Sequence, residues 1–146
     1  LIETFINCRL KRYRIEIVLD LCPEMLVVEG GCGQIDIVLS NLLVNAIDAL
    51  DKTPSPRIVV RTWAEDAYAA IAISDNGPGV PQDIRKRLFD PFFSTKEVGQ
   101  GSGLGLSISQ AIVTKRGGFI AYDAANGEGA CFVVKLPAVD LERAKS

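Results

Sequence analysis

One segment, residues 34–50, constrains the fold more than any other, because it is apolar around most of a helical surface. Its apolar residues recur at the three- and four-residue spacing of an α-helix. A helix with so wide an apolar face has to bury that face against another layer of secondary structure. The apolar positions are Ile35, Val38, Leu39, Leu42, Leu43, Ala46, Ile47, Ala49 and Leu50.

Segments with the alternation and composition of strands lie on both sides of this helix. We expect strands over residues 14–21, 57–63, 67–74, 119–122 and 130–136, a short extended run at 25–29 and a turn at 30–33. In the first strand, Ile15, Ile17, Leu19 and Leu21 are expected to share one face. Asn126-Gly127, between the last two strands, is a hairpin signal.

Three shorter helical segments complete the pattern, over residues 1–11, 83–89 and from Leu104 to the glycines at 117–118. Strands and helices are mixed along the chain, and the chain ends in a hairpin. We therefore predict an α+β fold, a two-layer α/β sandwich. Its single mixed, mainly antiparallel sheet is expected to be covered on one face by helices.

The chain of 146 residues has the length of one domain and contains no histidine. That absence excludes Ser-His-Asp hydrolysis, Cys-His proteolysis and His-ligated zinc within the chain. Its net charge of −2 and pI near 5.2 argue against a nucleic-acid partner. No segment has the length of a membrane span or the pattern of a signal peptide, so we expect a cytoplasmic domain without direct membrane contact.

Polar residues interrupt the apolar helix in one narrow stripe. Asn41, Asn45 and Asp48 share a helical face, which is either an ordinary solvent-facing stripe or a functional one. Asparagine is a poor helix former for a solvent-facing stripe. Amide and carboxylate oxygens are, in contrast, suitable ligands for a hard divalent cation.

Two glycine-rich segments are further candidates for a binding site. Asp75-Asn76-Gly77-Pro78-Gly79 follows a strand directly, and it is either a plain β-turn or a carboxylate beside backbone that a flat ligand can approach closely. Residues 99–106, GQGSGLGL, lead into a helix, whose first amides form an anion site. The alternative for residues 99–106 is a flexible linker. They match neither a Walker P-loop nor a dinucleotide-binding fingerprint.

Together and in this order, the motifs resemble the ATP-binding catalytic domain of bacterial sensor histidine kinases, within the gyrase, chaperone, histidine kinase and mismatch-repair ATPase superfamily. The resemblance covers roughly residues 15–137 and implies the Bergerat ATP-binding fold. Residues 41–49 are similar to the N box, 75–79 to the first glycine box, 88–96 to the F box and 101–106 to the second glycine box. The N box and F box look most like those of the nitrogen-sensor and dicarboxylate-sensor subgroup.

The resemblance implies a role for each matched residue. Asn45 would coordinate Mg²⁺, Asn41 would support that site, and Asp75 would accept a hydrogen bond from the adenine amino group. Lys96 would neutralise phosphate charge, and a lid over residues 90–103 would be anchored by Phe89, Phe92 and Phe93. Asn41 and Lys96 are the expected catalytic residues. The expected ATP-binding residues are Asn41, Asn45, Asp48, Asp75, Gly77, Gly79, Lys96, Gly101, Ser102, Gly103, Leu104 and Gly105.

The same resemblance implies an organisation and partners. Residues 1–14 would be a linker helix from an upstream dimerisation and phosphoacceptor domain, 15–137 the catalytic domain and 138–146 a tail. The domain would pass the γ-phosphoryl group of Mg-ATP to a histidine of the dimerisation domain, for relay to a response regulator. The parent protein could be anchored in the inner membrane. A serine-directed kinase of the anti-sigma type and a non-catalytic nucleotide-sensing module are the alternatives.

Two of the departures from the family pattern bear on the chemistry of the site. Asn41 stands where relatives that hydrolyse ATP carry a glutamate as general base, which favours transfer to a partner over hydrolysis. Ala130 stands where the family usually has threonine, so one water-mediated contact near the base is expected to be missing.

Overall fold

Five strands form one mixed sheet in a computed structural model that describes residues 2–29, 32–91, 93, 105–124 and 129–139. The strands lie in the order β1-β2-β3-β5-β4. Only β1 and β2 are parallel, and the other three neighbouring pairs are antiparallel. The strands are β1 (Glu16–Asp20), β2 (Arg57–Glu65), β3 (Tyr68–Asp75), β4 (Phe119–Tyr122) and β5 (Cys131–Pro137).

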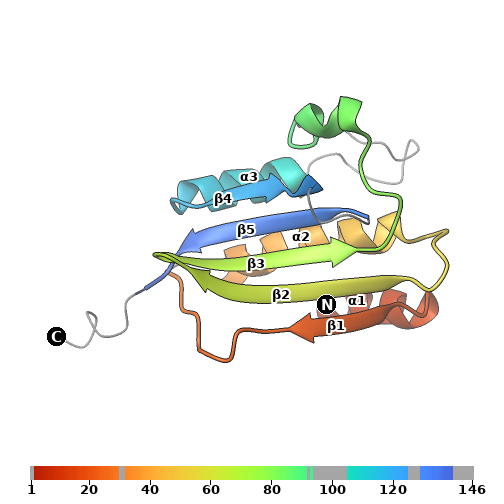
Figure 1. Ribbon diagram of the computed structural model, residues 1–146, viewed down its shortest axis with the longest axis horizontal. Helices are drawn as coiled ribbons and strands as arrows, with labels where there is room; N and C mark the ends of the chain where they lie inside the picture. Colours follow the sequence, from red (N-terminus) through yellow and green to blue (C-terminus); the bar gives the residue numbers. More distant parts are fainter. Residues whose placement is uncertain (1, 30–31, 92, 94–104, 125–128, 140–146) are drawn as a thin grey trace.

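The helices α1, α2 and α3 lie on one side of this sheet, as Figure 1 shows. A short 3₁₀ segment, η1, lies at one end of the molecule, beyond the edge of the sheet (Figure 1). The predicted α+β sandwich with one helix-covered face is therefore confirmed. The bounds are α1 (Ile2–Arg12), α2 (Cys32–Ala49), η1 (Gln82–Arg87) and α3 (Gly105–Lys115).

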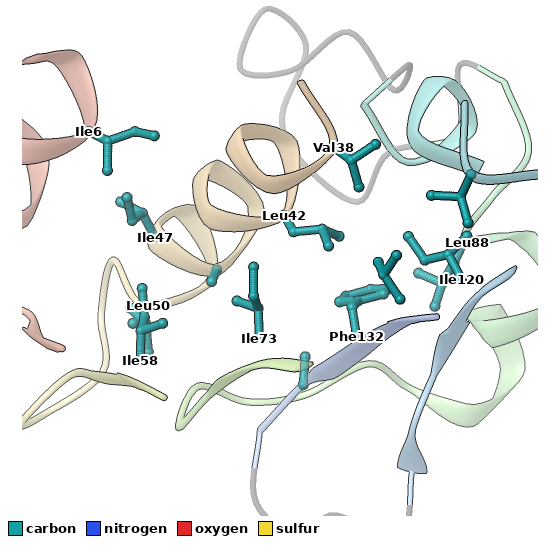
Figure 2. Close-up of a cluster of buried hydrophobic side chains, with 14 of the residues drawn as sticks. Ile6, Val38, Leu42, Ile47, Leu50, Ile58, Ile73, Leu88, Ile120 and Phe132 are labelled. Carbon is teal, nitrogen blue, oxygen red and sulfur yellow. The ribbon is translucent and has the colours of Figure 1, made fainter. Parts of the chain in front are cut away.

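The core fills the space between α2 and the sheet (Figure 2). Val38, Leu42 and Ile47 of α2 are each 1% exposed, and Ile58 of β2 is fully buried. Ile73 of β3 and Phe132 and Val134 of β5 join them from the sheet. The wide apolar face of α2 is thus buried as its composition predicts, and this burial fixes the helix on the sheet.

Two local expectations from the sequence are wrong. The segment at 30–33 was expected to be a turn, but α2 already begins at Cys32, so Cys32 and Gly33 are helical. The extended run at 25–29 forms only an isolated bridge between Val28 and Ala138. Met25 in that run is 82% exposed, so no sheet neighbour buries it.

The first strand lies at the edge of the sheet and is covered only over its first part. Ile15, just before β1, is buried, whereas Leu19 and Leu21 are 62% and 54% exposed.

Among the helices that the structure describes, none is long and apolar enough to cross a membrane.

Candidate functional site

Asp75, the last residue of β3, is a buried carboxylate whose side chain is oriented by backbone amides. Asp75 as a whole is 7% exposed. Its Oδ1 accepts hydrogen bonds from the N–H of Gly77 (2.9 Å) and the N–H of Ala130 (3.3 Å). Burial raises the pKa of Asp75, and the two amides act against that rise. Within the described residues both bonds go to Oδ1, so Oδ2 remains for a ligand that donates a hydrogen bond.

Asn76 holds the turn that follows Asp75 against the start of β2. Its Oδ1 accepts from the N–H of Arg57 (2.7 Å), and its Nδ2 donates to the carbonyl oxygen of Ser55 (2.9 Å). This asparagine therefore has a positioning function within the DNGPG motif, which fixes the backbone beside the Asp75 carboxylate.

Two close approaches explain glycines around Asp75. A Cβ on Gly77 would lie 2.9 Å from the carbonyl oxygen of Ala49, the last residue of α2. A Cβ on Gly129 would lie 1.8 Å from the carbonyl oxygen of Asp75, and Gly129 has a φ of +70°. The turn after β3, the end of α2 and the start of β5 therefore meet at backbone distance.

Gly129 and Ala130 are contributions to the site that sequence reasoning missed. The departure noted at Ala130 concerns the hydroxyl that its side chain lacks, whereas the group that contacts Asp75 is its backbone N–H. Residue pattern alone gives little sign of this, since any non-proline residue offers that amide. The glycine before it was the available signal.

In the middle of α2, Asn41 links that helix to α3. Its Nδ2 donates to the carbonyl oxygen of Gly105 (3.1 Å) and to Oγ of Ser109 (3.2 Å). Ser109 is fully buried, and its hydroxyl donates to the same Gly105 carbonyl (2.8 Å). The network fixes the first residue of α3 beside the polar stripe.

α3 begins at Gly105, so glycine there does not carry the cost that it has in the interior of a helix. A Cβ there would be 3.7 Å from its nearest neighbour, an atom of Asn41. Space alone therefore gives no reason for glycine at this position.

Asn45 and Asp48 follow on the same face of α2, between Asn41 and Ala49. Asn45 is partly exposed, and its side-chain amide has no hydrogen-bond partner within the described part of the chain. Asp48 is engaged differently, because its Oδ1 lies 2.6 Å from Nη2 of Arg9 in α1. Asn45 is therefore available to a ligand, whereas Asp48 is held by α1.

These contacts place the candidate site along one helix. Ala49 lies against the Asp75 turn and Asn41 against the start of α3. They are eight positions apart along α2, which corresponds to a rise of about 12 Å at 1.5 Å per residue. The arrangement suits an elongated ligand with a hydrogen-bond donor at one end and negatively charged oxygens at the other.

Several predicted site residues lie outside the described ranges, namely Lys96, Gly101, Ser102, Gly103 and Leu104, as does Phe92. Of the predicted lid anchors, Phe89 packs edge-on against Phe132, with ring centroids 6.2 Å apart. The Phe93 ring lies under the guanidinium of Arg87 at 4.6 Å.

Comparison with known sequences adds to this geometry. The model of a family described as "Histidine kinase-, DNA gyrase B-, and HSP90-like ATPase" matches residues 33–140. The two-component sensor PprA of Pseudomonas aeruginosa is 41% identical, over 88% of this chain and 14% of PprA. The C4-dicarboxylate transport sensor protein DctB of Rhizobium meliloti is 40% identical, over 81% of this chain and 18% of DctB. The chain thus spans less than a fifth of these relatives.

Several histidine kinases of solved structure have a similar fold. The mycobacterial sensor histidine kinase MprB matches with a TM-score of 0.74 and 31% identity, over 93% of this chain and 95% of that one. ShkA in complex with AMPPNP matches with a TM-score of 0.79 and 26% identity, over 94% of this chain and 28% of the ShkA chain. ThkA in complex with the response regulator TrrA matches with a TM-score of 0.77 and 25% identity, over 94% of this chain and 38% of the matched chain.

Proposed function

The chain belongs to the family of histidine kinase-, DNA gyrase B- and HSP90-like ATPases, and on that premise we propose that it is the catalytic domain of a two-component sensor histidine kinase. It binds Mg-ATP and transfers the γ-phosphoryl group to a histidine of another domain. The observation that carries this proposal is the buried Asp75 carboxylate, oriented by two backbone amides at the end of the α2 polar stripe.

Asp75 is the proposed adenine ligand. An ionised carboxylate only accepts hydrogen bonds, and adenine offers an amino group where guanine has a carbonyl. Guanine would place an acceptor against an acceptor in a buried site, which is strongly unfavourable. Gly77 and Gly79 let the backbone of the turn lie against the flat base, and Gly77 has no room for a side chain.

The phosphates are proposed to lie toward Asn45 and the start of α3. The amides of Gly101, Ser102, Gly103, Leu104 and Gly105 bind their oxygens, and Lys96 neutralises their charge. Asn45 is the proposed Mg²⁺ ligand, since its amide oxygen, which has no hydrogen-bond partner among the described residues, suits a hard cation that takes few protein ligands. When bound, Mg²⁺ supplies charge neutralisation to the triphosphate.

Asn41 is proposed to orient the phosphate end of the site. Its amide fixes the first residue of α3, and an amide cannot act as the general base that water attack would need. The chain therefore positions ATP for an external nucleophile. Because this chain has no histidine, the acceptor lies elsewhere.

We propose the remaining organisation from the resemblance and the relatives. Residues 1–14 link to an upstream dimerisation and phosphoacceptor domain, 15–137 form the catalytic domain, and 138–146 are a tail. The complex of ThkA with a response regulator supports such a regulator as the downstream partner. The length of the relatives supports a larger parent protein. We include in the proposal that this parent protein can be anchored in the membrane.

A phosphotransfer assay tests this function. The 146-residue chain is incubated with γ-labelled Mg-ATP and the separately produced phosphoacceptor domain encoded with it. The expected result is an acid-labile, alkali-stable label on that domain. An Asn45→Ala chain is the matched control and should give no label. An acid-stable label would indicate a serine-directed kinase, and no label despite bound ATP would contradict kinase activity.

A further inference from the structure

An ion pair joins α1 to the helix that carries the polar stripe. Arg9 Nη2 lies 2.6 Å from Asp48 Oδ1, and the two side chains are only 25% and 19% exposed. The Arg9 guanidinium also lies 5.8 Å from the centre of the Tyr13 ring. Ile6 of α1, 8% exposed, belongs to the same core as α2. The pair is therefore held by a docked helix and does not depend on two free side chains.

The position of Asp48 makes this pair relevant to the nucleotide site. Asp48 directly precedes Ala49, whose carbonyl oxygen adjoins the Asp75 turn through Gly77. Asn45 lies one turn earlier on the same face. A ligand with its base at Asp75 and its phosphates at Asn45 has to pass the turn of α2 that carries Asp48. An unneutralised carboxylate there would repel the phosphates.

We propose that Arg9 is a positioning residue of the nucleotide site, which neutralises Asp48 and holds it away from the triphosphate. The inference rests on the proposed function and deepens it, since it makes α1 a determinant of affinity for the phosphates. This proposal replaces the role of ATP ligand that the resemblance implies for Asp48, because its carboxylate is engaged by Arg9. Arg9 acts through Asp48 and does not itself contact the nucleotide. Because coupling is reciprocal, bound triphosphate stabilises the docked position of α1.

Four variants of the chain test the proposal: Arg9→Met, Arg9→Lys, Asp48→Asn and the double variant Arg9→Met/Asp48→Asn. Mg-ATP and adenosine are titrated separately into each variant, and the affinity is measured from the NMR chemical-shift changes. Arg9→Met should weaken Mg-ATP binding by about tenfold, the size of one partly screened charge interaction. Adenosine binding should not change, because adenosine has no phosphates. Arg9→Lys keeps the charge and should stay close to wild type.

The double variant carries the sharpest expectation. If Arg9 serves to neutralise Asp48, removing the carboxylate removes the need for Arg9, so the double variant should recover wild-type affinity. Asp48→Asn alone should bind Mg-ATP at least as tightly as wild type. A pair that only holds α1 in place predicts the opposite: both single variants weaken both ligands, and the double variant shows no recovery. That pattern would overturn the proposal.

Arg12→Met is the matched control. Arg12 is exposed on the same helix, and within the described residues it has no ion pair, so the variant loses the same charge without breaking one. Its Mg-ATP affinity should stay within about twofold of wild type, and an equal loss in Arg12→Met and Arg9→Met would contradict a specific role for Arg9. If the wild-type chain binds neither ligand, the proposed function fails; if it binds both and Arg9→Met changes nothing, only the role of Arg9 fails.

Discussion

At the scale of single residues, Asp75 combines two opposing effects. Burial raises its pKa, while the amides of Gly77 and Ala130 stabilise the ionised form. The sequence predicts the carboxylate itself, because it follows a strand and precedes a glycine turn. It does not predict the Ala130 amide, which lies 55 positions later, directly before β5, and is brought to Asp75 by the pairing of β3 with β5.

Asp75→Asn is expected to abolish most ATP binding and to leave the fold intact. The amide can still accept from both backbone N–H groups, but its own NH₂ opposes the adenine amino group. Loss of one charged hydrogen bond corresponds to about 2 kcal/mol, or roughly thirtyfold in affinity. Titration with a fluorescent ATP analogue measures it. Unchanged affinity would contradict the adenine assignment, and the far-UV circular dichroism spectrum of the variant should match wild type.

The raised pKa of Asp75 also predicts a pH dependence with a definite sign. The folded protein takes up this proton at higher pH than the unfolded chain, so the Asp75 contribution to the free energy of unfolding rises as pH falls through the folded pKa. ATP affinity changes in the opposite direction, because only the ionised carboxylate accepts from adenine. Urea unfolding and ATP titration across mildly acidic pH measure both. In Asp75→Asn neither change should remain, and an unaltered pH profile there would contradict the assignment.

At the scale of elements, glycines set how closely the turn after β3 and the start of β5 approach. The strands and helices follow from their hydrophobic periodicity, and each predicted strand except the run at 25–29 forms. The predicted start of α2 at Gln34 is two residues too late, because Cys32 and Gly33 look like turn residues locally, and the ends of helices are the least regular part of their pattern. Backbone contacts between elements have no local periodicity, so the approach of Gly129 to Asp75 could not be predicted.

Gly129→Ala is expected to destabilise the fold and weaken ATP binding together. A methyl group would lie 1.8 Å from the Asp75 carbonyl oxygen, and a positive φ disfavours alanine. We expect a loss of at least about 2 kcal/mol in the free energy of unfolding. Gly33→Ala is the control, since nothing lies within 4 Å of a Cβ there and Gly33 is in the first turn of α2. Urea denaturation should show Gly33→Ala at least as stable as wild type, and equal losses would refute the explanation.

At the scale of the whole molecule, α2 forms the core with one face and the candidate site with the other. The apolar residues of α2 point toward the sheet (Figure 2). By burying the helix, they also fix Asn41 beside the first residue of α3 and Asp48 beside Arg9 of α1. Because the apolar and the polar pattern are both periodic within one segment, the sequence predicts the fold class and also that Asn41, Asn45 and Asp48 share one face of a helix. The partners of α2 at the site come from elements distant in sequence. Arg9 is one example, since no local pattern pairs it with a residue 39 positions later.

Leu42→Ala tests whether the core and the site depend on the same helix. Leu42 is 1% exposed in the centre of the core, so truncation should cost about 2–5 kcal/mol of unfolding free energy through lost burial and the cavity left behind. Leu19→Ala removes the same atoms from a residue that is 62% exposed and should change stability by less than about 0.5 kcal/mol. Urea denaturation measures both, by tryptophan fluorescence and by retention of a bound ATP analogue. If α2 joins core and site, the two probes must shift to lower urea together in Leu42→Ala. Loss of analogue binding well before the fluorescence change would show that the site opens independently of the core.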